Sequence, residues 1–153
     1  MRINIVLVEP EIPANTGNIA RTCAVTGARL HLVEPLGFSI EDKYLKRAGL
    51  DYWKYLNVTV HHDIQSFFSE TKGEYYYCST KAVQYYYQVK FEDNCYILFG
   101  KETRGLPEDL IYANPNRCIK IPMKEGLRSL NLSNAVSVVL YEGLRQDNFT
   151  DLK

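Results

Sequence analysis

The sequence predicts an α/β fold with a mainly parallel sheet, and three observations support this prediction. Segments with strand character alternate with segments of helical character along the chain, which is typical of parallel sheets joined by helices. The first apolar run, Ile3–Val8, is broken only by Asn4, rich in Ile and Val and too short for a helix, which indicates a strand covered on both faces. The chain has 153 residues, of which 46% are hydrophobic, so we expect one domain with its own core over residues 1–153.

The first unit consists of a strand, a loop, a helix and a second strand. After Ile3–Val8, the prolines and asparagines within residues 10–18 interrupt the apolar pattern and predict a loop. Ile19–Thr26 then has helical character, and Gly27 can end that helix in the left-handed conformation. Leu30–Val33 is predicted to be the second strand.

The rest of the chain continues this alternation. In chain order, the predicted elements are a charged helix at Asp42–Leu50, a strand at Val58–His61, a short helix at Ile64–Ser69, strands at Tyr75–Ser79 and Tyr96–Phe99, a helix starting near Pro107, a strand at Arg117–Ile121 and a helix at Ser133–Gln146. Apolar residues recur at helical spacing from Val136 to Leu144 in the last helix, and Ser133 is placed to cap it.

Charge and hydropathy exclude several functional classes. Lys and Arg together number 18 and Asp and Glu together number 18, for a net charge of zero. This balance argues against binding nucleic acid by bulk electrostatics, although it leaves a local basic patch open. No apolar run reaches the roughly 18 to 20 residues that a membrane span needs, so we expect a cytoplasmic protein with no membrane partner.

The cysteines and histidines do not form a recognisable metal site. The cysteines are widely scattered with no Cys-x-x-Cys pair, which indicates buried free thiols in a reducing compartment. They are Cys23, Cys78, Cys95 and Cys118. His61 and His62 are adjacent but have no carboxylate at metal-ligand spacing, so we expect them at a solvent-exposed strand end.

Three loops concentrate glycine, asparagine and charge after predicted strands: residues 9–21, 100–107 and 122–134. An open α/β sheet binds its ligands at the carboxyl ends of its strands. The second loop has two glycines at Walker spacing but lacks the Lys and the Ser or Thr that must follow them, which argues against a nucleoside triphosphatase. Gly-x-Gly-x-x-Gly and Gly-x-Ser-x-Gly are also absent, which argues against the usual dinucleotide cradle and the esterase elbow.

Polar side chains of these loops are the candidate functional groups. They are Asn15, Arg21, Glu102, Arg128, Ser129 and Asn131. Arg21 lies on the predicted helix, six residues after Asn15. We therefore expect the two side chains to face one ligand near the N-terminus of that helix. The alternative for Arg21 is a surface ion pair with a carboxylate, and for Ser129 and Asn131 it is turn and cap chemistry.

Two runs of tyrosine, at residues 75–77 and 85–87, are unusual in this composition. Exposed tyrosines can stack on nucleobases. Because strands also favour Tyr, we expect these runs to serve strand packing instead.

Together, the three loops resemble the motifs of the SPOUT superfamily of RNA methyltransferases. The segments that carry the resemblance are NIVLVEPEIPANTGNIARTCA at 4–24, LFGKETRGLP at 98–107 and IPMKEGLRSLNLSNAVSVVLYEGLRQ at 121–146. Within the superfamily, the chain is similar to the tRNA (cytidine/uridine-34) 2'-O-methyltransferase group, which modifies the wobble nucleotide. The resemblance implies a Rossmann-like α/β fold with helices on both faces of the sheet and a C-terminal segment threaded through a loop as a trefoil knot.

The resemblance also implies a cofactor, S-adenosylmethionine, with S-adenosylhomocysteine as product and no metal. The cofactor would lie bent among the loops of the knot and be contacted largely by backbone groups. The positions that match the cofactor site are Cys78, Ser79, Gly100, Ile121, Ser129 and Leu130.

For catalysis, the resemblance assigns activation of the ribose hydroxyl to Arg21. The positioning residues that it implies are Asn15, Glu102, Ser129 and Asn131. Because a guanidinium with a pKa above roughly 12 is a poor base, we expect Arg21 to hold a flanking phosphate bidentately instead. Tyr141 on the last helix is a further candidate, with core packing as its alternative.

The implied partners are the tRNA anticodon loop and a second copy of the chain. Members without an appended RNA-binding domain work as homodimers, with the last helix and the first motif near the interface. Basic residues of both subunits would then form the RNA surface, among them Lys43, Lys46, Arg47, Lys120, Lys124 and Arg128. Two alternatives remain, a 2'-O-methyltransferase for ribosomal RNA and a noncatalytic RNA-binding dimer.

Overall fold

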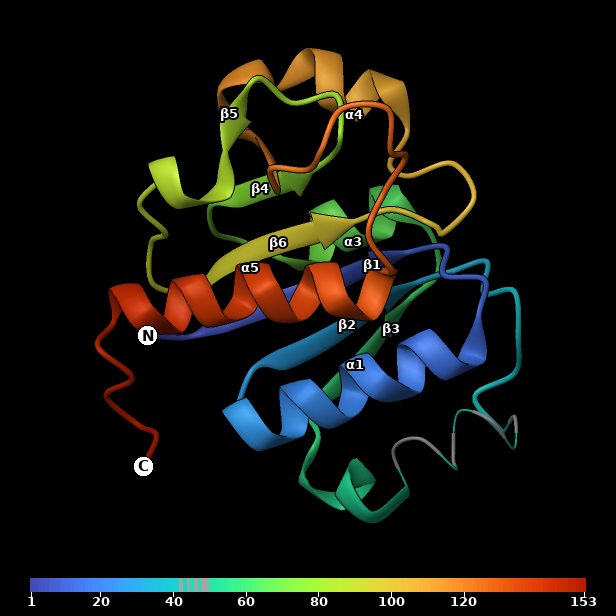
Figure 1. The fold of residues 1–153 in the computed structure, drawn as a ribbon. Helices are drawn as coiled ribbons and strands as arrows, with labels where there is room; N and C mark the ends of the chain where they lie inside the picture. The colour runs from blue at the N-terminus through green and yellow to red at the C-terminus, as the bar shows by residue number, and fades with distance from the viewer. Residues whose placement is uncertain (42, 44, 46, 48–49) are drawn as a thin grey trace.

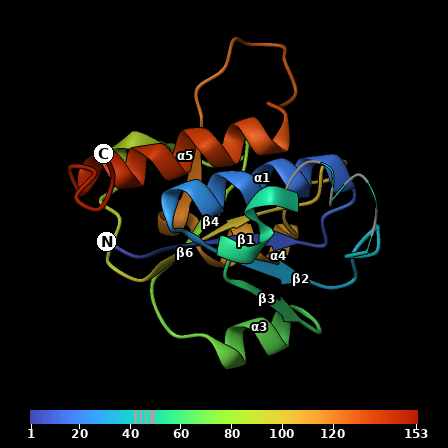
Figure 2. The ribbon, with the colours of Figure 1, turned by 90° about the horizontal axis from the view of Figure 1, so that it is seen from below.

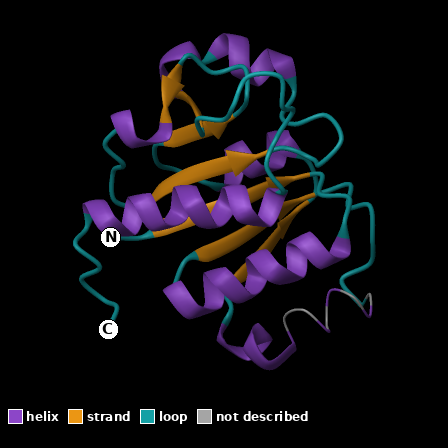
Figure 3. Ribbon diagram, viewed as in Figure 1, coloured by secondary structure: helices purple, strands orange, loops and turns teal. Residues whose placement is uncertain are grey.

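A parallel sheet forms the centre of the molecule (Figures 1 and 3). The computed structural model describes residues 1–41, 43, 45, 47 and 50–153. The strands are β1 Ile3–Val8, β2 Arg29–Val33, β3 Val58–His61, β4 Tyr75–Cys78, β5 Gln84–Tyr85, β6 Cys95–Phe99 and β7 Cys118–Lys120, in the order β3-β2-β1-β6-β4-β7-β5. All pairings between these strands are parallel, so their carboxyl ends lie at one edge of the sheet.

Helices cover both faces of this sheet, as predicted. They are α1 Pro13–Thr26, α3 Ile64–Glu70, α4 Glu108–Ala113 and α5 Leu132–Gln146, with short 3₁₀ helices η1 Leu50–Tyr55, η2 Tyr86–Gln88 and η3 Pro115–Arg117. Figure 2 shows α1 and α5 side by side on one face and α3 on the other. No helix in the described part of the chain is long and apolar enough to cross a membrane.

The apolar run of β1 fits its place between these two layers. All of its residues are buried. Ile3, Ile5 and Leu7 belong to the core under α1 and α5, whereas Val6 and Val8 belong to the core under α3 and α4. Because successive residues of a strand point to opposite faces, a strand packed on both sides needs a nearly continuous apolar sequence. The exception, Asn4, is buried and donates to the carbonyl of Cys95 at 2.9 Å.

Helix α1 corrects the loop predicted over residues 10–18. It begins at Pro13 and not at Ile19. Proline suits the first turn of a helix, because the N–H that it lacks would have no intrahelical partner there and its fixed φ is already helical. Gly27 ends the helix with a φ of 76°, as predicted.

Most other predicted elements are confirmed to within a few residues. Strand β5 was not predicted, because two residues are too few to show the alternation of a strand. The helix predicted at Asp42–Leu50 falls on a segment in which residues 42, 44, 46, 48 and 49 lie outside the described residues, as does Lys46 of the expected RNA surface.

The chain returns across the sheet after its last strand. Strand β7 lies between β4 and β5, which both precede it in sequence. Residues 121–131, orange in Figure 1, then lead back to α5, which packs against α1 and β1. This path brings all three predicted loops to the carboxyl edge of the sheet, while the trefoil threading stays a prediction.

Candidate active site

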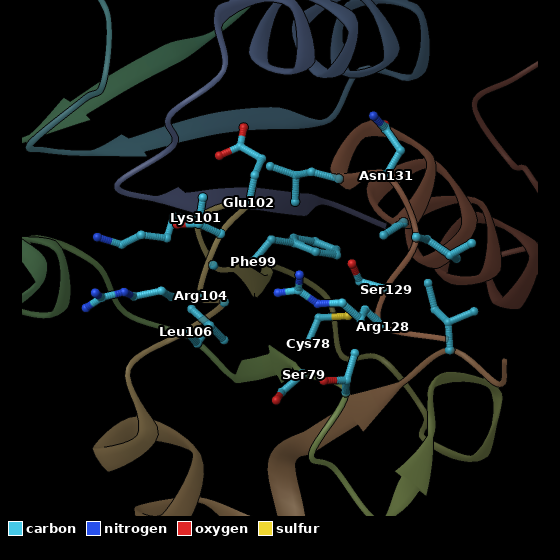
Figure 4. A pocket seen from close by; sticks show the side chains of 18 of the residues that line it. Cys78, Ser79, Phe99, Lys101, Glu102, Arg104, Leu106, Arg128, Ser129 and Asn131 are labelled. Atoms are coloured by element: carbon cyan, nitrogen blue, oxygen red, sulfur yellow. The ribbon is translucent and has the colours of Figure 1, made fainter. Parts of the chain in front are cut away.

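A pocket of about 520 Å³ opens at the carboxyl ends of β4, β6 and β7 (Figure 4). Its walls come mainly from residues 78–81, 99–106, 120–121, 123 and 128–132, together with Ile12 and Asn15 at the start of α1. The volume falls within the range of roughly 300 to 1,000 Å³ that is typical of sites for small molecules and cofactors.

All six residues predicted to bind the cofactor line this one pocket. They are Cys78, Ser79, Gly100, Ile121, Ser129 and Leu130. They come from three separate segments of the chain, which the parallel sheet brings to a common edge. Their role in binding stays a prediction, but their convergence is a structural fact.

Glu102 fastens the second loop to the start of α1. One oxygen of its carboxylate, Oε2, accepts a hydrogen bond from the backbone N–H of Glu11 at 2.8 Å. The other, Oε1, accepts from the N–H of Ile12 at 3.1 Å and from Nδ2 of Asn15 at 3.3 Å. A carboxylate at a helix N-terminus also interacts favourably with the helix dipole, so Glu102 stabilises the first turn while it orients Asn15.

Asn131 fastens the third loop to the same group. Its Nδ2 donates to Oδ1 of Asn15 at 3.0 Å, and its Oδ1 accepts from the backbone N–H groups of Ser133 at 2.9 Å and Asn134 at 3.3 Å. Asn131 is therefore the N-cap of α5, and the prediction that Ser133 caps this helix is wrong. The Ser133 hydroxyl instead donates to Oδ1 of Asn131 at 2.6 Å.

These contacts form a continuous chain of side chains, Glu102–Asn15–Asn131, which we call the amide relay. It joins all three predicted loops along the wall of the pocket. The cap chemistry considered as an alternative for Asn131 is present, and the same side chain also orients Asn15. Ser129 lines the pocket too, and within the described part of the chain its hydroxyl has no hydrogen-bond partner.

Arg21 is not part of the pocket wall. It lies on the exposed side of α1, where its NH2 group donates to the hydroxyl of Tyr52 at 3.1 Å and its Cζ lies 4.5 Å from the centre of the Tyr52 ring. Arg21 and Asn15 therefore do not line one pocket within a single chain, and the expectation that they face one ligand stays a prediction. The alternative of a carboxylate partner is not met among the described residues.

Glycine is required sterically in the second loop. A Cβ at Gly100 would lie 1.9 Å from the carbonyl carbon of Gly105, and Gly105 itself has a φ of 72°. The loop therefore folds back on itself between these two positions, with a bridge between Lys101 and Gly105. This tight return shapes one wall of the pocket.

The pocket is basic although the whole chain is neutral. One carboxylate, that of Glu102, lines it together with five cationic side chains, Lys81, Lys101, Arg104, Lys120 and Arg128. Lys81 pairs with Glu108, and Lys101 lies 3.6 Å from Glu9. Arg104 and Arg128 have no ion pair within the described ranges, so their charges are available to an anionic ligand. Lys101 and Arg104 were not among the predicted functional residues, although both lie inside the second motif.

The cysteines are free thiols, as predicted. Cys78 lines the pocket, but burial raises its pKa to about 12. It is therefore a neutral thiol at physiological pH and a poor nucleophile. Burial raises the pKa values of Cys23 and Cys95 to about 12 in the same way.

The prediction that both adjacent histidines are exposed is wrong for His61. His62 is exposed, but the His61 side chain is buried against Phe67. Its Nε2 lies 2.9 Å from Nδ1 of His31, and its Nδ1 lies 2.6 Å from a carboxylate oxygen of Glu70. Sequence spacing could not reveal this cluster because its members come from two strands and a helix.

The two tyrosine runs differ in their environment. Tyr76 and Tyr77 are buried in the core, which confirms strand packing for the first run. In the second run only Tyr85 lies in a strand, and its ring stacks on that of Tyr87 with the centres 5.5 Å apart. Tyr87 remains 51% exposed, so the prediction of strand packing is wrong for this residue.

Comparison with known proteins agrees with this architecture. The model of the SpoU rRNA Methylase family matches residues 2–141. A tRNA (cytidine(34)-2'-O)-methyltransferase of Escherichia coli K12 is 52% identical over 146 residues, which cover 94% of this chain and 93% of the relative. A relative from Yersinia pestis with the same name is 50% identical over 151 residues, covering 94% and 93% of the two chains.

Solved structures share the fold. A structure described as giving insights into the 2-OH methylation of C/U34 on tRNA superposes with a TM-score of 0.92 at 41% identity, covering 97% of both chains. The SpoU methyltransferase AviRb from Streptomyces viridochromogenes, in complex with AdoMet, has a TM-score of 0.83 at 21% identity over 95% of this chain and 57% of its own. The chain therefore belongs to the SpoU methylase family of SPOUT methyltransferases, as its three loops predict.

Proposed function

We propose that this protein methylates the 2'-hydroxyl of the wobble nucleotide of tRNA, a cytidine or modified uridine, with S-adenosylmethionine as methyl donor. One observation carries the proposal: the three motif loops converge on a single pocket and are joined there by the amide relay. The names of relatives about half identical over nearly the whole chain support this substrate.

The cofactor fits what the pocket offers. The close return of the loop at Gly100 leaves no room for a side chain there, which brings the backbone to the pocket surface. Cys78, Ser79, Gly100, Ile121, Ser129 and Leu130 would hold the cofactor. S-adenosylmethionine supplies an electrophilic methyl group on a sulfonium. Cys78 is neutral, so it does not compete as a nucleophile for that methyl group.

The protein's own side chains would orient the ribose and the RNA backbone. The amide relay fixes Asn15 at the pocket wall, and the Ser129 hydroxyl is free to bind a ribose or cofactor oxygen. Arg104 and Arg128 offer unpaired charge to RNA phosphates. Arg21 would hold a phosphate next to the reacting ribose, since a guanidinium is a poor base.

A homodimer would complete the site. Arg21 lies outside the pocket of its own chain, and α1 and α5 expose Val25, Val138 and Tyr141 with 51%, 37% and 45% of their surface accessible. Packing of a second copy on these helices would cover the apolar side chains and supply an additional basic surface. The free cysteines fit a reducing cytoplasm, where we place the protein.

The decisive experiment is transfer of labelled methyl from S-adenosylmethionine to total tRNA from a strain that lacks this protein. We expect label in the ribose of the wobble nucleotide, identified by digestion to nucleosides and by mapping of the modified position. Ribosomal RNA from the same strain is the matched control substrate. Label only in ribosomal RNA would contradict the proposal that tRNA is the substrate. Cofactor binding without any methyl transfer would favour a noncatalytic RNA-binding protein.

A further inference from the structure

Tyr52 holds the side chain of Arg21 in two ways. The guanidinium lies over the ring, with Cζ 4.5 Å from the ring centre, and its NH2 group donates to the phenol oxygen at 3.1 Å. The ring and its hydroxyl therefore contact the guanidinium at two points, which restrains its position more than a single hydrogen bond would.

The segment that carries Tyr52 is packed against the rest of the fold. It lies on the short helix η1, which packs along α1, the helix that carries Arg21. The next residue, Trp53, is partly buried against the core under α1 and α5. Because its neighbour is anchored in the core, Tyr52 can hold the long and otherwise mobile Arg21 side chain in one place.

An aromatic partner has a consequence that a carboxylate partner would not have. Cation–π contact and a phenol hydrogen bond orient a guanidinium without neutralising it. In the described part of the chain Arg21 makes no ion pair, so its charge stays uncompensated. Of the five N–H donors of an arginine, one is used by Tyr52, and the others have no partner among the described residues.

We propose that Tyr52 is a positioning residue, which presents Arg21 with its full charge to a phosphate of the bound RNA. This inference rests on the proposed function, in which Arg21 contacts a phosphate beside the reacting ribose. It adds a residue that lies outside the three motif loops and the pocket, in η1.

The test compares kcat/KM for tRNA in three Tyr52 variants. Tyr52→Leu removes both the ring and the hydroxyl, and we expect about a 10-fold loss. Tyr52→Phe keeps the ring and should lose only about threefold. Tyr52→Glu places a carboxylate beside Arg21, and we expect a loss at least as large as for Leu. The salt dependence of Tyr52→Glu should match that of Arg21→Ala. In both variants we expect the slope of log kcat/KM against log salt concentration to be shallower than in the parental protein by about one.

Tyr55→Leu is a matched control. Tyr55 lies on the same short helix, is 69% exposed and has its own cation, Lys54, whose Nζ is 4.9 Å from the ring centre. It is an aromatic–cation pair that does not involve Arg21, so this variant should retain parental kcat/KM and salt slope. Cofactor affinity and the thermal midpoint, measured for every variant, separate loss of fold from loss of positioning.

Double substitution decides whether Tyr52 acts through Arg21. If it does, Tyr52→Leu causes no further loss of kcat/KM when Arg21 is already replaced by alanine. An equal loss in both backgrounds would overturn the inference, as would parental kcat/KM and salt slope in Tyr52→Leu and Tyr52→Glu. Full activity of Arg21→Ala would instead remove the phosphate role of Arg21 from the proposed function, and the inference with it.

Discussion

At the scale of single residues, Asn131 combines a structural and a functional role that substitution can separate. Asn131→Ala removes the cap of α5, which should lower stability by about 1 kcal/mol, and it also frees Asn15. Asn131→Asp keeps an oxygen for the N–H groups of Ser133 and Asn134, but it cannot donate to Asn15 and competes with Glu102 for the amide hydrogens. We expect both variants to lose methyl transfer, whereas only Asn131→Ala loses thermal stability. Parental turnover in the Asp variant would show that the amide relay is dispensable.

His31 gives the fold a dependence on pH. Burial, together with the neighbouring His61, lowers the pKa of His31 from 6.5 to about 4. The unfolded chain therefore takes up a proton below pH 6.5 that the folded chain refuses, so stability falls as the pH falls from about 6.5 to about 4. The loss from this group is at most about 3 kcal/mol. Urea unfolding across this range should show the decline, and His31→Gln should flatten it. An equally steep decline in the variant would assign it to other groups.

At the scale of elements, the second loop depends on its tight return at Gly100. A methyl group there would meet the Gly105 backbone, so Gly100→Ala must open the loop, and we expect at least a 10-fold loss of cofactor affinity by calorimetry.

Gly27→Ala is the control for this prediction. Gly27 also has a positive φ, of 76°, but no atom lies within 4 Å of the added carbon. It should cost about 1 kcal/mol of stability and leave cofactor affinity unchanged. Parental affinity in Gly100→Ala would show that the loop adapts.

Elements were predictable where local sequence decides them. The apolar run of β1, broken only by Asn4, and the helical spacing of α5 are properties of nearby residues, and both elements are confirmed. The start of α1 was missed because proline breaks a helix in its interior but suits its first turn, and the sequence alone does not say which applies. The cap of α5 was assigned to Ser133 because Asn131 and Ser133 both suit an N-cap, and only the structure shows which backbone groups each side chain contacts.

Prediction of the site was limited by contacts between distant segments. Topology predicts that loops after parallel strands gather at one edge, and the pocket is there. The amide relay joins residues from three loops, and no local pattern encodes their distances. No sequence pattern identified Tyr52 as a functional residue, since it lies in a short 3₁₀ helix outside every motif.

At the scale of the whole molecule, the proposed homodimer can be broken at α5. Val138 and Tyr141 are exposed on this helix, and Val138→Glu or Tyr141→Glu would place a charge in a buried interface. We expect the mass from light scattering to fall from dimer to monomer, together with methyl transfer. Tyr112→Glu, on α4 and 67% exposed, should change neither. A monomeric parental protein would contradict the proposal.

The pairing of β1 has a consequence for how the chain is made. Ile3 pairs in register with Cys95, and α1 and α5 both cover this face of the strand. A ribosome adds residues in order, at roughly 5 to 20 per second, so α1 and β2 can pack against β1 well before β6 and α5 emerge. During this interval the edge of β1 that pairs with β6 has no partner, and an unpaired strand edge is a template for aggregation. We therefore expect chaperones to bind the nascent chain until β6 has emerged.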